Sequence, residues 1–249
     1  MRKCRLPIGW PRRDPRHYHF PLPQCGMGYK LKSIEFVLLS YLCCCRLHNR
    51  NDEAVSVEDV AKAVHLTVGT VKKYLSNLVS RELITDGWSL APAFQDADDR
   101  KFFTLPNEIF LLNLPPSAFM VYAYLLLIED RRTHTCHPSY NTIAAETDMT
   151  KNAAMRSIGA LLDAGLITME HSQYFDQCGM KWKGNNLYTI LPTQRAVGAF
   201  HQRQFDRLEL DAERRRVRSR QEEYDRRHPR IALSTPPSAP GDSGPAPAA

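Results

Sequence analysis

Residues 139–161 read SYNTIAAETDMTKNAAMRSIGAL, and residues 56–78 read SVEDVAKAVHLTVGTVKKYLSNL. In both stretches an apolar residue is followed by alanine, and six residues after that apolar position comes Met149 or Leu66, then a threonine. Serine and threonine are preferred at helix N-caps, so each stretch predicts a short helix, a turn and a second helix. Apolar residues at i, i+4 and i+7 form the buried face of that second helix, namely Val71, Leu75 and Leu78 in one stretch and Ala154, Ile158 and Leu161 in the other.

The two stretches belong to a longer repeat with no gap. Phe20 corresponds to Phe103 and Thr85 to Thr168, and both pairs are 83 residues apart. We call residues 20–85 copy 1 and residues 103–168 copy 2. Two copies are too few for a solenoid, so each is expected to be a small domain with its own core. The first-copy residues that recur are Phe20, Leu22, Pro23, Leu31, Phe36, Tyr41, Leu42, Ser56, Ala61, Thr67, Leu78, Leu83, Ile84 and Thr85.

Composition narrows the class of protein. The formal net charge of +6 over 249 residues favours a polyanionic partner. The longest apolar run, residues 36–45, is far shorter than the ~20 residues of a membrane span, so no membrane partner is expected. Basic residues at the N-terminus are followed by prolines rather than an apolar segment, which predicts a cytoplasmic protein without a secretory signal.

The cysteines predict neither a disulfide framework nor a metal centre. There are seven, without a CxxC pair, and residues 43–45 continue an apolar helix face, so free thiols are expected. His134, Cys136 and His137 are conceivable zinc ligands, but three donors on one loop without a distant second pair do not match a structural zinc site. We therefore predict no metal and no cofactor.

Each copy is expected to begin with a short extended element and a largely buried helix. The first helix follows Ser33 as its N-cap, the second follows Pro115, Pro116 and Ser117, and polar loops cover 46–55 and 129–138. The predicted organisation is a basic, Pro-rich arm (1–19), a first domain with a short wing (20–94), an acidic linker (95–100), a second domain (101–192), a charged helix (193–230) and a disordered tail (231–249).

A β-hairpin is predicted after copy 2. Extended segments at 169–174 and 187–191 flank a basic tip at 178–186 that contains glycine and asparagine. In a nucleic-acid-binding protein Lys181 and Lys183 would lie beside the minor groove or the backbone, which favours phosphate contact as their role. After copy 1 the chain turns at Asp86-Gly87, which is too short for a long hairpin.

These features resemble the winged helix-turn-helix family of bacterial DNA-binding proteins, and the resemblance covers both copies. It implies a mainly α fold with small β wings, built as two tandem winged helix-turn-helix domains plus a C-terminal helix. In this family the second helix of the motif enters the major groove. The residues that this resemblance places against DNA are Val68, Gly69, Thr70, Lys72 and Lys73 in copy 1, and Thr150, Lys151, Asn152, Ala153, Met155, Arg156, Lys181 and Lys183 in and after copy 2.

Copy 2 has the richer reading surface. Lysine and arginine neutralise phosphates or read guanine, and Asn152 suits adenine. Copy 1 offers mainly Thr70 and two lysines, so copy 2 is expected to specify the sequence and copy 1 to anchor the protein. A three-helix core with polar outward residues also occurs in protein-interaction modules, which keeps a non-DNA-binding adaptor open as an alternative.

Three segments carry a narrower resemblance, namely 102–110 (FFTLPNEIF), 122–125 (YAYL) and 136–140 (CHPSY). They resemble helix-turn-helix proteins of bacterial plasmids and conjugative elements, some of which are grouped with replication initiators. This resemblance implies a mobile-element setting but does not choose between replication initiation and transcription.

Motifs of common enzymes are missing from the sequence. It contains no GxxxxGK[ST], GxGxxG, GxSxG or HExxH element. The His17-Tyr18-His19 segment is not the pair of histidines around one apolar residue that DNA-nicking enzymes use, so we predict a protein that is not an enzyme.

The sequence therefore predicts a sequence-specific binder of double-stranded DNA, foremost a transcriptional regulator. A replication initiator of a plasmid or conjugative element is the alternative. Homodimerisation and contacts with the replication or transcription machinery stay open. The helix at 194–228 has a stripe of Val197, Phe200, Gln204 and Leu208 and then an arginine block; a solvated helix is favoured over a DNA-binding or oligomerisation helix.

Overall fold

The computed structural model describes residues 19–23, 30–48, 56–91, 102–175 and 181–228. Most of the predicted arm, the acidic linker, the outermost part of the wing and the tail lie outside these ranges. The described residues form two compact units, one up to His201 and one from Gln202 onward, and helix α9 (Thr193–Arg227) runs through this boundary. None of the described helices is long and apolar enough to cross a membrane.

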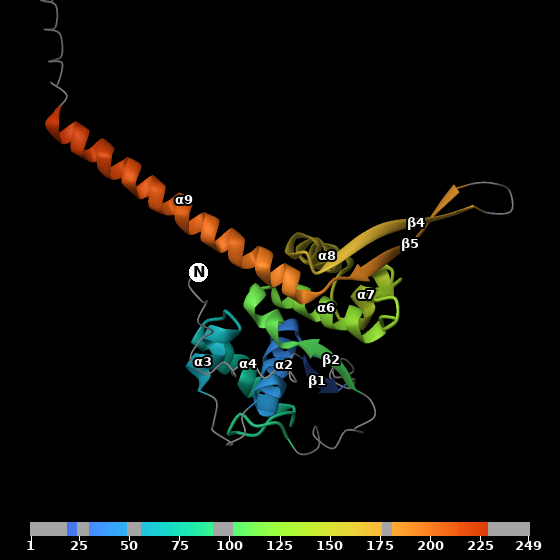
Figure 1. Cartoon of the computed structure of the whole chain (residues 1–249). Coiled ribbons are helices and arrows are strands. Elements are labelled where there is room, and N and C mark those ends of the chain that lie inside the picture. Colours follow the sequence, from blue (N-terminus) through green and yellow to red (C-terminus); the bar gives the residue numbers. More distant parts are fainter. Residues whose placement is uncertain (1–18, 24–29, 49–55, 92–101, 176–180, 229–249) are drawn as a thin grey trace, which may run out of the picture. The chain divides into compact units, whose positions relative to one another are not determined.

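The order of helices and strands repeats from copy 1 to copy 2 (Figure 1). Copy 1 consists of β1 (His19–Pro23), α2 (Ser33–His48), α3 (Val57–Ala63) and α4 (Val68–Ser80). Copy 2 consists of β2 (Phe102–Pro106), α6 (Pro116–Ile128), α7 (Tyr140–Glu146) and α8 (Lys151–Ala164), with a 3-10 helix, η1 (Asn107–Leu112), after β2. Each element of copy 2 that has a counterpart begins 83 residues after it.

Backbone conformations repeat at the same offset. His65 and Asp148 both have positive φ, at 55° and 50°, in the turn between the paired short helices. Glu82 and Gly165, at 58° and 72°, also correspond, and they follow α4 and α8. Only glycine adopts this region without strain, so copy 1 holds a glutamate where copy 2 has the unstrained residue.

Helix α2 begins differently from the prediction. Ser33 is its first helical residue rather than its N-cap, because the carbonyl of Lys32 accepts the first helical hydrogen bond from the amide of Phe36. The amide of Lys32 donates to Glu35 Oε2 at 3.0 Å, which is the glutamate half of a capping box. The side-chain hydrogen bond at the start of α2 is therefore made by Glu35, the third residue of the helix, and not by Ser33.

The expectation of a separate core in each copy is wrong. β1 pairs antiparallel with β2, with Phe20 opposite Leu105 and Leu22 opposite Phe103, and the buried hydrophobic residues of both copies form one cluster. Helix α2 packs against α6, where the rings of Phe36 and Phe119 lie 6.1 Å apart. Among the described residues, neither β1 nor β2 has a partner strand within its own copy, so the ladder joins the two copies and their buried apolar residues form one interior.

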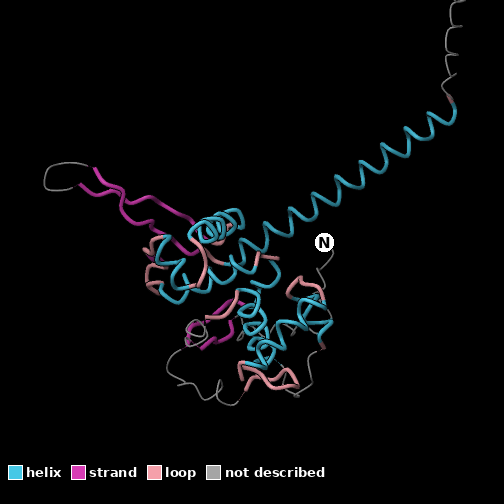
Figure 2. The backbone as a smooth tube through the Cα atoms, turned by 180° about the vertical axis from the view of Figure 1, so that it is seen from behind, coloured by secondary structure: helices cyan, strands magenta, loops and turns pink. Residues whose placement is uncertain are grey.

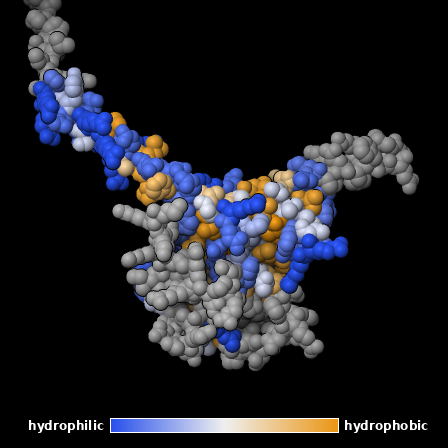
Figure 3. All heavy atoms as spheres, viewed as in Figure 1, coloured by the Kyte–Doolittle hydropathy of each residue, from blue (hydrophilic) through white to orange (hydrophobic). Residues whose placement is uncertain are grey.

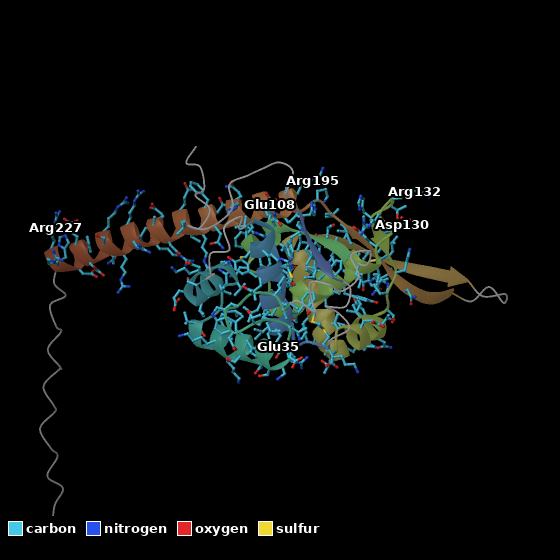
Figure 4. All side chains as sticks on the ribbon, turned by 90° about the horizontal axis from the view of Figure 1, so that it is seen from below. Glu35, Glu108, Asp130, Arg132, Arg195 and Arg227 are labelled. Carbon is cyan, nitrogen blue, oxygen red and sulfur yellow. The ribbon has the colours of Figure 1, made fainter. Side chains whose placement is uncertain are left out.

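A polar contact ties α2 to α4 in copy 1. The Glu35 side chain (labelled in Figure 4) is only 2% exposed; its Oε1 accepts a hydrogen bond from Asn77 Nδ2 at 3.1 Å, and Arg81 Nη2 lies 4.0 Å from Oε2. The corresponding positions of copy 2 are all alanine, at 118, 160 and 164. The same helix pair is therefore joined by a buried carboxylate in copy 1 and by close apolar packing in copy 2.

The wing of copy 2 is a three-stranded sheet in the order β3-β5-β4, and Figure 2 shows it apart from the β1–β2 pair. The hairpin prediction is confirmed by β4 (Ile167–Phe175) and β5 (Lys181–Ile190). Two details differ. The loop predicted at 129–138 contains β3 (Thr135–Cys136), and residues 181–186 of the tip predicted at 178–186 lie within β5. The short wing of copy 1 is confirmed as a single bridge between Ile84 and Leu90.

Helix α9 is confirmed as a charged helix. In the part before Gln202, Val197 and Phe200 are partly buried and pack against the hydrophobic core. From Gln202 onward nearly every residue is exposed, and hydrophilic side chains predominate in the space-filling view (Figure 3). Ion pairs at helical spacing join Arg214 to Asp211 at 3.8 Å and Arg218 to Glu222 at 3.1 Å. These features fit the solvated-helix interpretation.

Alanine substitution should have opposite effects on stability at Gly159, which lies within α8, and at Gly165, which is its C-cap. Gly165→Ala is expected to lower the free energy of unfolding by about 1 kcal/mol, because its φ of 72° disfavours any Cβ although space around it is open. Gly159→Ala, inside the helix and equally open, is expected to raise it by about 1 kcal/mol. Urea unfolding of both variants measures the two signs; equal signs would contradict the backbone explanation.

Glu35→Ala is expected to lower the free energy of unfolding by about 2 kcal/mol, because it removes the hydrogen-bond acceptor of the Asn77 side-chain amide. A double-mutant cycle with Asn77→Ala, followed by chemical unfolding, measures the coupling between the two side chains. We expect a coupling energy of at least about 0.5 kcal/mol. Additive effects would show that the contact contributes nothing of its own.

Candidate nucleic-acid interface

The turn between α7 and α8 is built from local hydrogen bonds. After α7 the chain passes through Asp148 in the left-handed region, and the amide of Met149 donates to the carbonyl of Ala144 at 3.0 Å. The hydroxyl of Thr150 then accepts from the amide of Ala153 at 3.2 Å and so caps α8. The threonine cap predicted from the sequence is confirmed, and it fixes where α8 begins.

Copy 1 uses the same bonds. The amide of Leu66 donates to the carbonyl of Ala61 at 3.0 Å, and the hydroxyl of Thr67 accepts from the amide of Thr70 at 3.3 Å. His65 takes the place of Asp148 in the left-handed turn. Both copies therefore contain the complete helix-turn-helix motif, and the two second helices begin in the same local geometry.

The inward faces of α4 and α8 are those the sequence predicted. Val71, Leu75 and Leu78 are buried in α4, and Ala154, Ile158 and Leu161 are buried in α8, joined there by Ser157. With these faces held in the core, the opposite faces look outward. This packing is what turns the predicted contact residues into an accessible surface.

The predicted DNA-contacting residues are exposed in register. Positions 68, 69, 72 and 73 of copy 1 are exposed, as are the corresponding positions 151, 152, 155 and 156 of copy 2, while Thr70 and Ala153 are half-buried at matching positions. Thr150 is exposed and is used as the cap. Met155 keeps 45% of its surface exposed, which leaves an apolar group on the outward face beside Lys151, Asn152 and Arg156. The structure thus brings the α8 residues together on one helix and the α4 residues together on another.

Charge on these faces favours a polyanion. Helix α4 carries Lys72 and Lys73 and no acidic residue, and the single acidic residue of α8 is Asp163 near its end. The N-terminus of a helix also carries partial positive charge, which adds to that of Lys151 at the start of α8. The faces suit phosphate contacts together with base-edge contacts.

A buried polar network holds the root of the wing. Asn186, 8% exposed, donates from Nδ2 to the hydroxyl of Tyr188 at 2.9 Å, and its Oδ1 accepts from Nδ1 of His171 at 3.0 Å. Burial raises the pKa of Tyr188 to about 12, which keeps the phenol neutral. Sequence reasoning missed the structural role of Asn186, since an asparagine near a glycine is also typical of a hairpin tip.

The wing lysines are placed only by their backbone. Lys181 pairs with Phe175 and Lys183 with Gln173 across the β4–β5 ladder. Their side chains lie outside the part of the chain that the structure describes, so their contact with phosphates stays a prediction.

A cavity of about 410 Å³ lies away from the predicted DNA contacts, between β1, β2, α6 and the start of α9. Glu129 lines it, and burial raises the pKa of this carboxyl although His134 Nδ1 lies 3.5 Å from Oε2. Burial also raises the pKa of Tyr122 to about 12, and it lowers the pKa of His19. None of the predicted DNA-contacting residues lines this cavity.

The conceivable zinc ligands do not form a site among the described residues. Cys136 is buried, and its burial raises the pKa of the thiol to about 12. Among the described residues, the cysteines at 43–45 take part in no disulfide, and the Cys44 thiol donates to Asn107 Oδ1 at 3.8 Å.

Comparison with known proteins supports the helix-turn-helix assignment. A family model described as a helix-turn-helix domain matches residues 112–167, which run from the end of η1 to the first residue of β4. The chain therefore contains a helix-turn-helix domain, and the match lies in copy 2. No curated protein matches the chain significantly.

A solved structure of a possible transcriptional regulator from Methanosarcina mazei Go1 shows a weak likeness. It is 17% identical, the match covers 45% of this chain and 89% of that one, and the TM-score is 0.30. At this TM-score the likeness carries no conclusion about fold or function.

Removing either threonine cap should destabilise the motif that it begins. Thr150→Ala and Thr67→Ala are each expected to lower the free energy of unfolding by about 1 kcal/mol, while the corresponding serine variants lose much less. Hydrogen exchange locates the effect, and we expect faster exchange in the first turn of α8 for Thr150→Ala and in that of α4 for Thr67→Ala. Destabilisation spread evenly over both motifs would contradict a local cap.

Proposed function

We propose that this protein is a sequence-specific binder of double-stranded DNA that acts as a transcriptional regulator. The observation that carries the proposal is α8, the second helix of the matched helix-turn-helix domain, whose outward face gathers Lys151, Asn152, Met155 and Arg156. These side chains combine cations, an amide and an apolar group on one exposed face. That combination suits the major groove, where base edges offer acceptors, donors and the thymine methyl.

In this proposal the first half of α8 lies in the major groove. Arg156 or Lys151 binds guanine O6 and N7 or an adjacent phosphate, Asn152 pairs with adenine, and Met155 contacts a thymine methyl. The Thr150 cap sets the direction of the helix start, and therefore the reach of these side chains. Recognition of this kind contributes about 1–3 kcal/mol per well-placed base contact.

Copy 1 and the wing contribute mainly affinity. Lys72 and Lys73 of α4 are exposed cations suited to phosphates, and the charge of Lys181 and Lys183 in β5 would serve the same end. Phosphate contacts position a protein on the duplex and carry no direct sequence information. The division of roles expected from the sequence is retained, with α8 as the main reader of base edges and α4, through residues such as Thr70, as the weaker one.

Occupation of a promoter by such a binder alters access or recruitment of the transcription machinery, which is the partner that the regulator role requires. Nothing in the comparisons supports the replication-initiator alternative or a plasmid setting, and we do not propose them. An interaction adaptor remains as an outcome of the tests.

Removal of the α8 cations should strongly reduce the preference for the specific duplex over random duplexes. Removal of the wing cations should leave this preference unchanged. Lys151→Ala with Arg156→Ala is expected to reduce the ratio of specific to random-duplex affinity about tenfold or more. Lys181→Ala with Lys183→Ala is expected to weaken all duplexes alike and to reduce the slope of log affinity against log salt by roughly 0.9 for each phosphate that the variant no longer neutralises. Fluorescence anisotropy with selected and random duplexes at several salt concentrations measures both.

Arg131→Ala with Arg132→Ala is the charge-matched control, since both residues are exposed and lie in the turn before β3 (Arg132 is labelled in Figure 4). The control should keep the discrimination ratio of the wild type. An equal decrease of discrimination in all three double variants would refute the assignment to α8. Absence of salt-sensitive DNA binding in the wild type would favour the adaptor.

A further inference from the structure

We propose that one chain reads two non-identical half-elements of DNA in inverted orientation, one with α4 and the other with α8. This inference rests on the proposed DNA-binding function and adds the architecture of the target site. A tandem duplication seen only in sequence is compatible with half-elements that point the same way. The geometry of the shared core decides for the inverted arrangement.

The register of β1 and β2 shows how the copies are related. Phe20 pairs with Leu105 across the ladder. The equivalent of Phe20 in copy 2 is Phe103, and the equivalent of Leu105 in copy 1 is Leu22. Phe103 and Leu22 also pair, so the ladder keeps its pairing when the two copies are exchanged. The central pair, Pro21 with Thr104, consists of two equivalent residues and is unchanged by the exchange. A ladder that is unchanged when its strands are exchanged has a two-fold axis at its centre, as antiparallel pairs do.

A second contact follows the same exchange. Phe36 and Phe119 are equivalent residues, and their rings meet where α2 packs against α6. A translation from one copy to the next would not bring equivalent residues face to face in both the ladder and the helix pair. The two copies are therefore related by an approximate two-fold axis that passes between these residue pairs.

This axis sets the relation between α4 and α8. A rotation does not change the position of a point along the rotation axis, so α4 and α8 lie at the same position along it. The same rotation carries the outward face of α4 onto that of α8. Duplex DNA also has two-fold axes, which relate its antiparallel strands. A two-fold protein that presents both outward faces to one duplex therefore matches half-elements in inverted order, and such half-elements have centres about 10–10.5 bp apart or a multiple of that.

The half-elements differ because the two reading faces differ. Equivalent positions of α4 and α8 have the same exposure but different residues. The exposed residues of α8 are Lys151, Asn152, Met155 and Arg156, and those at the equivalent positions of α4 are Val68, Gly69, Lys72 and Lys73. Among the described residues, copy 2 alone has a long wing, which adds backbone contacts on its side only. The expected site is an imperfect inverted repeat whose better specified half belongs to α8.

The experiment is selection of bound duplexes from a random pool by the full chain, with native mass spectrometry of the complexes. We expect two unlike half-elements in inverted orientation and one chain per duplex. The informative variant gives α4 the outward residues of α8 through Val68→Lys, Gly69→Asn, Thr70→Ala, Lys72→Met and Lys73→Arg. Its selected site should become a symmetric inverted repeat of the α8 half-element.

The outcomes separate this inference from the proposed function. Direct repeats, a single element, or two chains on each inverted repeat would overturn the inference and leave sequence-specific binding intact. No enrichment by the wild type would overturn the proposed function and the inference together.

Circular dichroism and thermal unfolding control for the fold of the variant. If it unfolds, the matching change in copy 2 alone, Met155→Lys with Arg156→Lys, should alter only the α8 half-element; a change in both halves counts against the inference.

Discussion

The structure depends on the contact between equivalent parts of the two copies. Five-residue strands pair around Pro21 and Thr104, and α2 meets α6 at Phe36 and Phe119. Among the described residues, neither copy has a second strand for this ladder, and the buried apolar residues of both copies form one cluster. Burial of these surfaces against each other therefore stabilises both helix-turn-helix motifs at once and holds their second helices in one fixed relation.

The copies differ outside the β1–β2 ladder and the Phe36–Phe119 contact. The buried carboxylate of Glu35 joins α2 to α4, while alanines fill the corresponding space of copy 2. Glu82 occupies a left-handed position where copy 2 has Gly165. One wing is a single bridge and the other a long hairpin anchored through Asn186 and Tyr188. The shared interior thus tolerates two different outer surfaces, and these surfaces are where the proposed DNA contacts lie.

Local order was predictable in detail. The caps at Thr67 and Thr150, the buried faces of α4 and α8 and the outward positions all follow from spacing and residue type within one or two helical turns. The prediction of Ser33 as a cap failed by one residue, because Glu35 supplies the capping oxygen instead. The β3 strand escaped prediction because two residues carry no periodic pattern, and Asn186 was misplaced because its partners lie on another strand and deeper in the sheet.

The sequence by itself determined the duplication, its offset of 83, both helix-turn-helix motifs and the difference between the wings, since each depends on neighbouring residues or on direct comparison of the copies. Only the tertiary structure decided that the copies share one core and are related by a two-fold axis. Those properties arise from contacts between residues far apart in the sequence, such as Phe36 with Phe119. An apolar pattern shows that a face is buried, but hydrophobic attraction is non-directional, so the pattern does not say which face covers it.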